Sequence, residues 1–251
     1  MIVNRKFLLT SGLVAFFSYS TTGFSQPIRT ANMSITNTQT FAKDFDQYSM
    51  HPILNQGTMF AYGTTYAAKG SRLLFEDWVK GTVVKNSGEE INGDKYFFNF
   101  DKLTNDLLVT VDKLEIIEVY RDSIQAFTFT SRGEVYAFKK MDAIQQFKFV
   151  QVLAGSTDKY NLYKVINTRF VLADYNTNGL TESGNPFDEY VDVNKYFIAY
   201  KGTIRTVELR FPSIRRALRE NSSKVKDYYA SHLLDEVNEN YLTDIVKYLN
   251  Q

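Results

Sequence analysis

Short apolar runs separated by polar turns fill the middle of the chain. Strand-like runs occupy residues 79–85, 95–100, 107–111, 115–120, 124–130, 134–139 and 145–153. The turn signals between them include Asn86-Ser87-Gly88 and the dipeptide Asn92-Gly93, which is typical of a type I′ hairpin. Because a flat sheet would leave apolar faces and edges uncovered, we expect an antiparallel meander that forms a barrel or a sandwich.

Two longer apolar runs follow, at residues 160–173 and 196–210, and they flank a polar loop. The chain contains 20 Phe and 17 Tyr but a single Trp, a composition that favours a β-sheet core. In the expected strand at 95–100, Tyr96, Phe98 and Phe100 share one face. An exposed aromatic platform for sugars or peptides is the alternative use of so many rings.

The period changes after Pro212, where apolar residues recur at helical spacing. Three short helices are predicted to begin at Ser213, at Ser222 or Ser223, and at Asn238 or Asn240. The apolar stripe of the last helix contains Leu242, Ile245, Val246 and Leu249. Isolated helices of this length are marginal in water, so we expect all three to dock on the sheet. The predicted fold class is therefore mainly β with α, an α+β protein.

The beginning of the chain has the pattern of a secretory signal peptide. Arg5 and Lys6 precede an apolar run at residues 7–19, and small or polar residues follow up to Ser25. That run is shorter than the about 20 residues that span a bilayer, and no later run approaches that length. We therefore predict no transmembrane span. The expected organisation is a signal peptide at residues 1–25, a flexible leader at 26–70, an antiparallel β domain at 71–211 and a helical segment at 212–251.

Charge and cysteine content narrow the function classes. Lys and Arg total 29 against 28 Asp and Glu, which does not indicate a nucleic-acid partner. The chain has no Cys, which excludes thiol catalysis and cysteine metal sites. A secreted animal domain of this length normally carries disulfides, so their absence favours bacterial export.

The loop between the two long runs begins like a calcium-binding loop. Asp174, Asn176 and Asn178 occupy the first, third and fifth places of an EF-hand pattern, and a glycine follows at the sixth. The twelfth place is Asn185 instead of the bidentate Glu, although Glu182 could replace that ligand. The sequence thus leaves two interpretations open, a weak calcium site and a polar turn between strands.

Few residues offer acid–base chemistry. The only histidines are His51 and His232, so a catalytic triad or a multi-histidine metal site is hard to assemble. The carboxylates available to a glycan-acting hydrolase are Glu115, Glu118, Glu182, Asp188 and Glu189. No spacing identifies a catalytic pair among them, because the required separation is three-dimensional.

A basic group surrounds the first predicted helix. Its members are Arg210, Arg215, Arg216, Arg219, Lys224 and Lys226, and the candidate binding residues among them are Arg215, Arg216, Arg219 and Lys224. Arg215 and Arg219 stand four residues apart on one helical face, where they could bind phosphate, lipopolysaccharide or an acidic protein. A solvated helix face is the alternative.

The last third of the chain resembles a group of exported bacterial proteins of unknown function. The resemblance rests on the order LADY, DEYVD at residues 188–192, NKYFIAY at 194–200, SIRRAL at 213–218 and YLTDIVKYLN at 241–250. It implies no activity, no cofactor and no catalytic residues.

We therefore expect an exported, non-enzymatic binding or structural module of the cell envelope, located in the periplasm, at the cell surface or outside the cell. Its expected partner is another envelope protein, a glycan or lipopolysaccharide, bound by an exposed face of the sheet or by the basic helix. The alternative is a glycan-acting hydrolase that uses carboxylates near residues 174–192.

Overall fold

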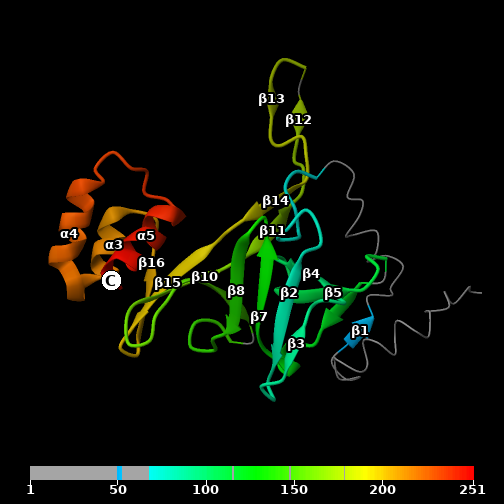
Figure 1. Cartoon of the computed structure of the whole chain (residues 1–251). Coiled ribbons are helices and arrows are strands. Elements are labelled where there is room, and N and C mark those ends of the chain that lie inside the picture. The colour runs from blue at the N-terminus through cyan, green and yellow to red at the C-terminus, as the bar shows by residue number, and fades with distance from the viewer. Residues whose placement is uncertain (1–49, 53–67, 115, 147, 178) are drawn as a thin grey trace, which may run out of the picture.

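The structure, a computed structural model, describes residues 50–52 and 68–251 except residues 115, 147 and 178 (Figure 1). It contains an eight-stranded sheet of order β16-β15-β10-β9-β8-β7-β2-β3 and a four-stranded sheet of order β1-β6-β5-β4. The strands of the large sheet are β2 (Lys80–Lys85), β3 (Glu90–Asn92), β7 (Ile124–Ser131), β8 (Glu134–Lys140), β9 (Phe149–Ala154), β10 (Asn161–Val165), β15 (Lys195–Tyr200) and β16 (Thr203–Val207). Those of the small sheet are β1 (Met50–Pro52), β4 (Phe97–Asp101), β5 (Asp106–Thr110) and β6 (Ile117–Val119).

Short helices close the chain. They are α3 (Phe211–Ala217), the 3-10 turn η3 (Arg219–Asn221), α4 (Ser222–Ser231) and α5 (Glu239–Leu249). Figure 1 shows them gathered at the β16 end of the large sheet, with the four-stranded sheet at the other end. Among the described residues, no helix is long and apolar enough to cross a membrane.

The antiparallel α+β architecture predicted from the sequence is confirmed. The strands within both sheets pair antiparallel. The end strands β16 and β3 do not pair with each other, so the large sheet is open and the barrel alternative is wrong. The sandwich alternative is correct for the part of the large sheet that the small sheet covers.

One row of directly paired residues crosses the large sheet from β3 to β16. Its members are, in order, Ile91, Val83, Phe127, Phe138, Gln151, Lys164, Tyr196 and Val207. Directly paired residues point to the same face of a sheet. The row is apolar at both ends and polar at Gln151 and Lys164, so two separate cores form on one face.

The first core lies between the two sheets and is rich in phenylalanine. Phe98 and Phe100 of β4 meet Phe127, Phe129 and Phe138 of the large sheet, and each is at most 2% exposed. The rings of Phe127 and Phe138 stack with centroids 4.8 Å apart. Each fully buried side chain of this kind contributes about 1.5–3 kcal/mol through the hydrophobic effect.

The second core lies between the large sheet and the helices. Leu162 and Ile198 of the sheet pack with Ile214 of α3 and with Leu242 and Ile245 of α5. Helix α5 forms because its apolar residues fall on one face and because the Asn238 side chain accepts a hydrogen bond from the Tyr241 N–H at 3.1 Å. The predicted docking of the helices on the sheet is thus confirmed.

Two asparagine side chains hold these covering layers to the sheet in the same way. Asn105, in the β4–β5 turn, accepts from the N–H of Phe149 at 2.7 Å and donates to its carbonyl at 3.3 Å. Asn250, after α5, accepts from the N–H of Tyr160 at 3.0 Å and donates to its carbonyl at 2.8 Å. Each amide therefore satisfies two backbone groups of the large sheet.

The predicted type I′ turn at Asn92-Gly93 is wrong. β3 pairs with β2 across the turn at Asn86-Ser87-Gly88, whereas β4 belongs to the small sheet. Gly93 serves a close approach, because a Cβ there would lie 1.9 Å from the carbonyl oxygen of Gly81. Positive φ angles at both turn residues, typical of type I′, occur instead at residues 132–133 and 201–202, which join β7 to β8 and β15 to β16.

Other boundaries also differ from the prediction. The run at 160–173 divides between β10 and β11 (Thr168–Val171), which belong to different sheets. Strand β1 falls inside the predicted leader at residues 26–70 and pairs with β6; the predicted signal peptide lies outside the described residues. Helix α3 starts one turn earlier than Ser213, with Arg210 as N-cap, and α4 has Asn221 as N-cap instead of a serine.

Candidate functional site

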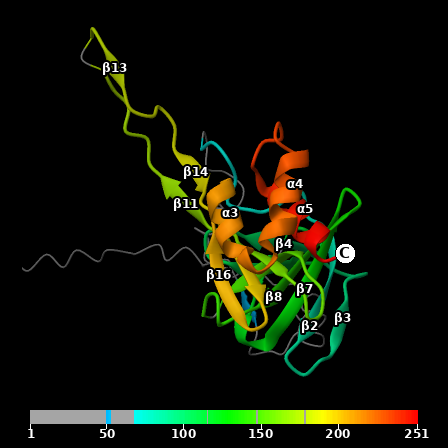
Figure 2. The same cartoon turned by 90° about the vertical axis from the view of Figure 1, so that its left-hand side faces the viewer.

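A two-stranded arm projects from the body of the molecule (Figure 2). We call residues 168–193 the arm. It contains β11, β12 (Asn176–Thr177), β13 (Glu182–Ser183) and β14 (Glu189–Asp192), with β11 paired to β14 and β12 to β13. Figures 1 and 2 both show the β12–β13 end far from the sheets. The arm therefore presents its tip to the surroundings on a hydrogen-bonded stem.

Buried polar contacts fix the base of the arm. The ammonium group of Lys102, in the β4–β5 turn, lies 2.8 and 2.9 Å from the two carboxylate oxygens of Asp192. The hydroxyl of Thr168 donates to the same carboxylate. Lys102 is only 8% exposed, whereas the Asp192 side chain is 44% exposed, so water reaches one side of this ion pair. The contact ties β11 and β14 to the small sheet.

A third segment supports the stem from the N-terminal side. The N–H of Lys69 donates to the carbonyl of Asp188, and the Lys69 carbonyl accepts from Tyr190 N–H, both at 2.8 Å. The Lys69 ammonium also lies 4.6 Å from the centre of the Phe187 ring. At Gly70, φ is +76° and a Cβ would lie 2.5 Å from the Tyr190 carbonyl oxygen, so glycine is required.

Exposed apolar side chains concentrate on the arm. Six of the fourteen large apolar residues that are exposed in the described part of the chain lie there: Phe170, Leu172, Tyr175, Leu180, Phe187 and Val193. Leu172 is 68% exposed and Leu180, near the tip, is 94% exposed. Apolar surface gathered in one place on a projecting element is typical of a protein-interaction site.

The arm is also strongly acidic. Residues 168–193 contain one basic residue, Arg169, against five acidic residues. This sign of charge repels anionic lipid and lipopolysaccharide surfaces and attracts a partner with a basic rim.

The predicted calcium loop forms the outer part of the arm. Asn176 pairs with Ser183, and Thr177 pairs with Glu182, so a β-hairpin replaces the helix-flanked loop of an EF-hand. The Asp174 carboxylate accepts from the N–H of Asn185 at 2.6 Å. Asn178 lies outside the described residues, and the described residues contain no group of three or more His, Cys, Asp or Glu side chains arranged for a metal. The weak calcium site stays a prediction.

The hydrolase candidates are divided between two parts of the molecule. Glu118 lies on β6 of the small sheet, Glu182 lies on β13, and Glu115 is outside the described residues. Asp188 and Glu189 lie in the middle of the arm, where Glu189 accepts from the Asn185 side chain at 3.4 Å. There the Asp188 carboxylate accepts from Ala173 N–H at 2.7 Å, a contact that shapes the hairpin.

The basic group is exposed, as the sequence predicted for a helix surface. Arg215 and Arg216 lie on α3, Arg219 on η3 and Lys224 on α4. Arg219 Nε is 3.6 Å from a Glu220 carboxylate oxygen that also pairs with Arg205. Binding of an anion by this group stays a prediction.

The two histidines lie in different layers. His51 belongs to β1, and its side chain is outside the described part. His232 follows α4, where its ring stacks on Tyr228 at 4.0 Å and its Nδ1 lies 2.8 Å from the Tyr228 carbonyl. These contacts favour a packing role for His232.

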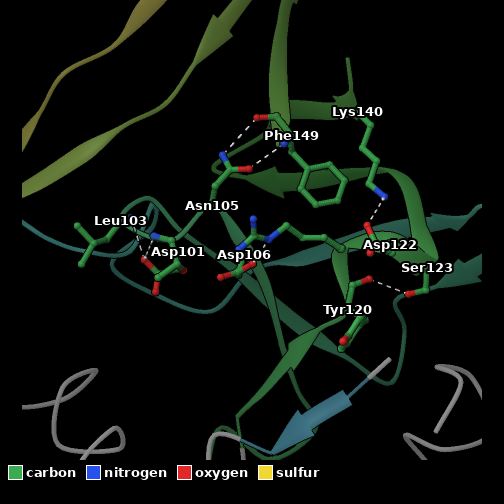
Figure 3. Close-up of polar contacts among 11 residues, drawn as sticks. Asp101, Leu103, Asn105, Asp106, Tyr120, Asp122, Ser123, Lys140 and Phe149 are labelled. Carbon is green, nitrogen blue, oxygen red and sulfur yellow. Dashed lines mark hydrogen bonds and ion pairs between the residues drawn. The ribbon is translucent and has the colours of Figure 1, made fainter. Parts of the chain in front are cut away.

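The densest group of buried polar residues surrounds the β4–β5 turn (Figure 3). Asp101, Asn105 and Asp106 are each at most 2% exposed. Asp101 is 2.6 Å from Arg72 Nε, and Asp106 pairs with Arg121. Figure 3 shows Asn105 turned toward the backbone of Phe149. Asn105 thus joins the β4–β5 turn to β9 of the large sheet, and the two ion pairs fix the turn to the segments that carry Arg72 and Arg121.

A second buried polar group marks the boundary between the two cores. Glu239, at the start of α5, lies 2.7 Å from Lys164 Nζ and accepts from the Tyr196 hydroxyl at 2.6 Å. Burial raises the pKa of Tyr196, and the hydrogen bond to Glu239 raises it further. The hydroxyl therefore keeps its proton, and the group attaches α5 to the sheet.

Sequence reasoning missed the arm as a surface. The glycines and asparagines of residues 174–185 were interpreted as a polar loop, which is correct for the turns. Only the exposed fractions of the intervening leucines and aromatic residues show that apolar surface gathers on the arm. No protein-family model, curated protein or solved structure matches the chain.

Proposed function

We propose that the protein is an exported, non-enzymatic module that docks another envelope protein through the arm. Export rests on the signal-peptide pattern at residues 1–25 and on the resemblance of the last third to exported bacterial proteins. The role of the arm rests on its exposed apolar side chains.

The concentration of exposed apolar residues on an anchored, projecting stem carries this proposal. A stem held by the Lys102–Asp192 ion pair keeps its shape before binding, which lowers the entropy cost of docking. The five acidic residues favour a protein with an apolar hollow and a basic rim over an anionic lipid surface.

The hydrolase alternative has weaker support. In the middle of the arm, Asp174 and Asp188 accept backbone hydrogen bonds that stabilise the hairpin. Their carboxylates stand on a projecting element, where water is not excluded from a reacting bond. The arm therefore favours docking over hydrolysis.

The chain offers a matched pair of variants for testing the docking proposal. Leu172 and Leu180 are 68% and 94% exposed on the arm, while Leu233 and Leu234 are 62% and 100% exposed between α4 and α5. We expect Leu172→Ser with Leu180→Ser to weaken partner binding about tenfold or more, and the serine substitutions at 233 and 234 to leave it unchanged. All four side chains are exposed, so both variants should keep their thermal midpoints.

The partner is identified by photo-crosslinking in the native host, with p-benzoylphenylalanine at position 180 or, as control, at position 234. The proposal expects one crosslinked envelope protein from position 180 only, and its binding to the serine variants is then measured. Equal crosslinking from both positions would reject the arm as the docking surface. A crosslink to a second copy of the chain, or to lipid alone, would reject a protein partner of the proposed kind.

A further inference from the structure

A pocket of about 400 Å³ lies between the segment before β2 and the β7–β8 hairpin. Its walls include Phe75, Glu76 and Asp77 from the segment before β2, together with Ser131, Arg132 and Tyr136 from the β7–β8 hairpin. We call it the Phe75 pocket. Its volume lies within the range of about 300–1,000 Å³ that is usual for small-molecule sites.

A buried side chain of β4 binds the backbone of the segment that carries the two carboxylates. Asn99 of β4, with 0% exposure, donates from its amide nitrogen to the Phe75 carbonyl at 2.9 Å. Its amide oxygen lies 3.2 Å from the Phe75 backbone nitrogen, which donates to it. The carbonyl of Asp77 also lies 3.4 Å from the Asn99 amide nitrogen. Backbone contacts to β4 on either side, at Leu74 and Val79, complete the attachment of this irregular segment, which is therefore preorganised.

The aromatic wall is equally fixed. The Phe75 ring packs edge-on against Phe129 at 5.5 Å and against Tyr136 at 5.0 Å. The Tyr136 hydroxyl donates to a Glu134 carboxylate oxygen at 2.9 Å. That hydrogen bond, and then burial, raise the pKa of Tyr136, so the hydroxyl keeps its proton and can accept from a ligand.

The walls of the Phe75 pocket combine hydrogen-bond acceptors, hydrogen-bond donors and aromatic rings. Glu76 and Asp77 supply acceptors, Arg132 supplies donors, the Ser131 hydroxyl supplies both, and the aromatic rings supply an apolar face. A cationic ligand would meet Arg132 unfavourably, and an anionic ligand would meet two carboxylates unfavourably. A polyol carries hydroxyl donors and acceptors around a ring with apolar C–H faces, and it matches all of these groups.

We infer that the Phe75 pocket binds a neutral sugar unit of a glycan. The rings of Phe75 and Tyr136 offer apolar surface to the sugar, while Glu76 and Asp77 accept from its hydroxyls and Arg132 donates to its oxygens. This site is separate from the arm, so the protein would hold a glycan and a protein partner at two different surfaces.

The inference is tested with maltotriose, cellotriose and triacetylchitotriose as probes, each titrated to millimolar concentration. Binding is followed by saturation-transfer NMR and by the fluorescence of Trp78, the single Trp of the chain, which adjoins Asp77. The test variant is Glu76→Gln with Asp77→Asn. The control is Asp235→Asn with Glu236→Gln, another adjacent and exposed acidic pair.

We expect at least one trisaccharide to bind the wild type and the control equally, and the Glu76→Gln, Asp77→Asn variant about tenfold or more weaker. Because both pocket carboxylates are exposed, the thermal midpoint should not change and a loss of binding is not a loss of fold. Absence of binding by all three sugars, or equal binding by the pocket variant, would overturn the inference. Binding of trilysine but of none of the three sugars would also overturn the inference, because it would assign the pocket to a basic peptide. None of these outcomes depends on the arm.

Discussion

The two cores share one face of the same sheet but are built from different material. Six of the sixteen buried residues of the first core are phenylalanines, and the small sheet covers it. The buried residues of the second core are tyrosines and aliphatic residues, and three helices cover it. Strand β9 contributes to both, since Phe149 belongs to the first core and Ala154 to the second. One continuous sheet can thus carry two hydrophobic cores, divided by the polar pair Gln151 and Lys164.

The cores also differ in how their covering layer is fixed to the sheet. Asn105 and Asn250 make the same pair of backbone hydrogen bonds, but Asn105 is 1% exposed and Asn250 is half-buried. Breaking a hydrogen bond that is shielded from water costs more free energy, because no water molecule can bond to the freed donor and acceptor. We therefore expect the two cores to respond unequally to equal changes.

The largest expected effect is removal of a core ring. Phe127→Ala should lower the free energy of unfolding by about 3–5 kcal/mol, because Phe127 packs against four other phenylalanines in the first core.

Ile245→Ala should lower the free energy of unfolding by about 2–5 kcal/mol, because the Ile245 side chain is 0% exposed in the second core. Urea midpoints are followed by Trp78 fluorescence for the first core and by far-UV circular dichroism for the helices. An Ile245→Ala protein as stable as wild type would contradict intramolecular docking of α5.

The asparagine pair should give a smaller and unequal effect. Asn105→Ala leaves the buried N–H and carbonyl of Phe149 without partners and should cost about 1–3 kcal/mol. Asn250→Ala exposes the corresponding groups of Tyr160 to water and should cost less. The same two probes and urea titrations measure both. Equal losses would show that burial does not distinguish the two contacts.

Alkaline pH should affect the second core first. Burial raises the pKa of Tyr160, Tyr196, Tyr228 and Tyr241, all of which belong to this core. A folded-state pKa above the unfolded value of about 10 means that the stabilisation is complete below that pH and is lost as pH rises. Above pH about 10, each such tyrosine lowers the free energy of unfolding by at most about 1.4 kcal/mol per pH unit.

Urea midpoints between neutral pH and pH about 11 check this expectation. The helical signal should fall more steeply with pH than the Trp78 signal, and Tyr196→Phe should reduce the slope. An equal slope for both signals would show that the two cores unfold as one unit.

Local signals predicted much of this architecture. The alternation that places Tyr96, Phe98 and Phe100 on one face, the turn at residues 86–88 and the cap at Asn238 all act over a few residues, and each is confirmed. The apolar face of α5 likewise predicted docking. These features could be found because hydrophobic period and capping depend on neighbours along the chain.

Features that depend on distant neighbours could not be predicted in this way. The dipeptide Asn92-Gly93 predicts a hairpin turn, and only the folded structure shows that Gly93 lies against Gly81 of β2. A pocket forms beside Glu76 and Asp77 only because the segment held by Asn99 packs beside the β7–β8 hairpin, which comes from a separate part of the chain.

An antiparallel, aromatic-rich sheet followed by amphipathic helices could be predicted from the sequence, because side-chain period and turn chemistry are local properties. Three features emerge only from the folded chain: the large sheet is open, two cores share one of its faces, and residues 168–193 project as an arm. The physical reason is that sheet order, burial and the exposure of Leu180 depend on which distant segments pack together, and no local pattern encodes those contacts.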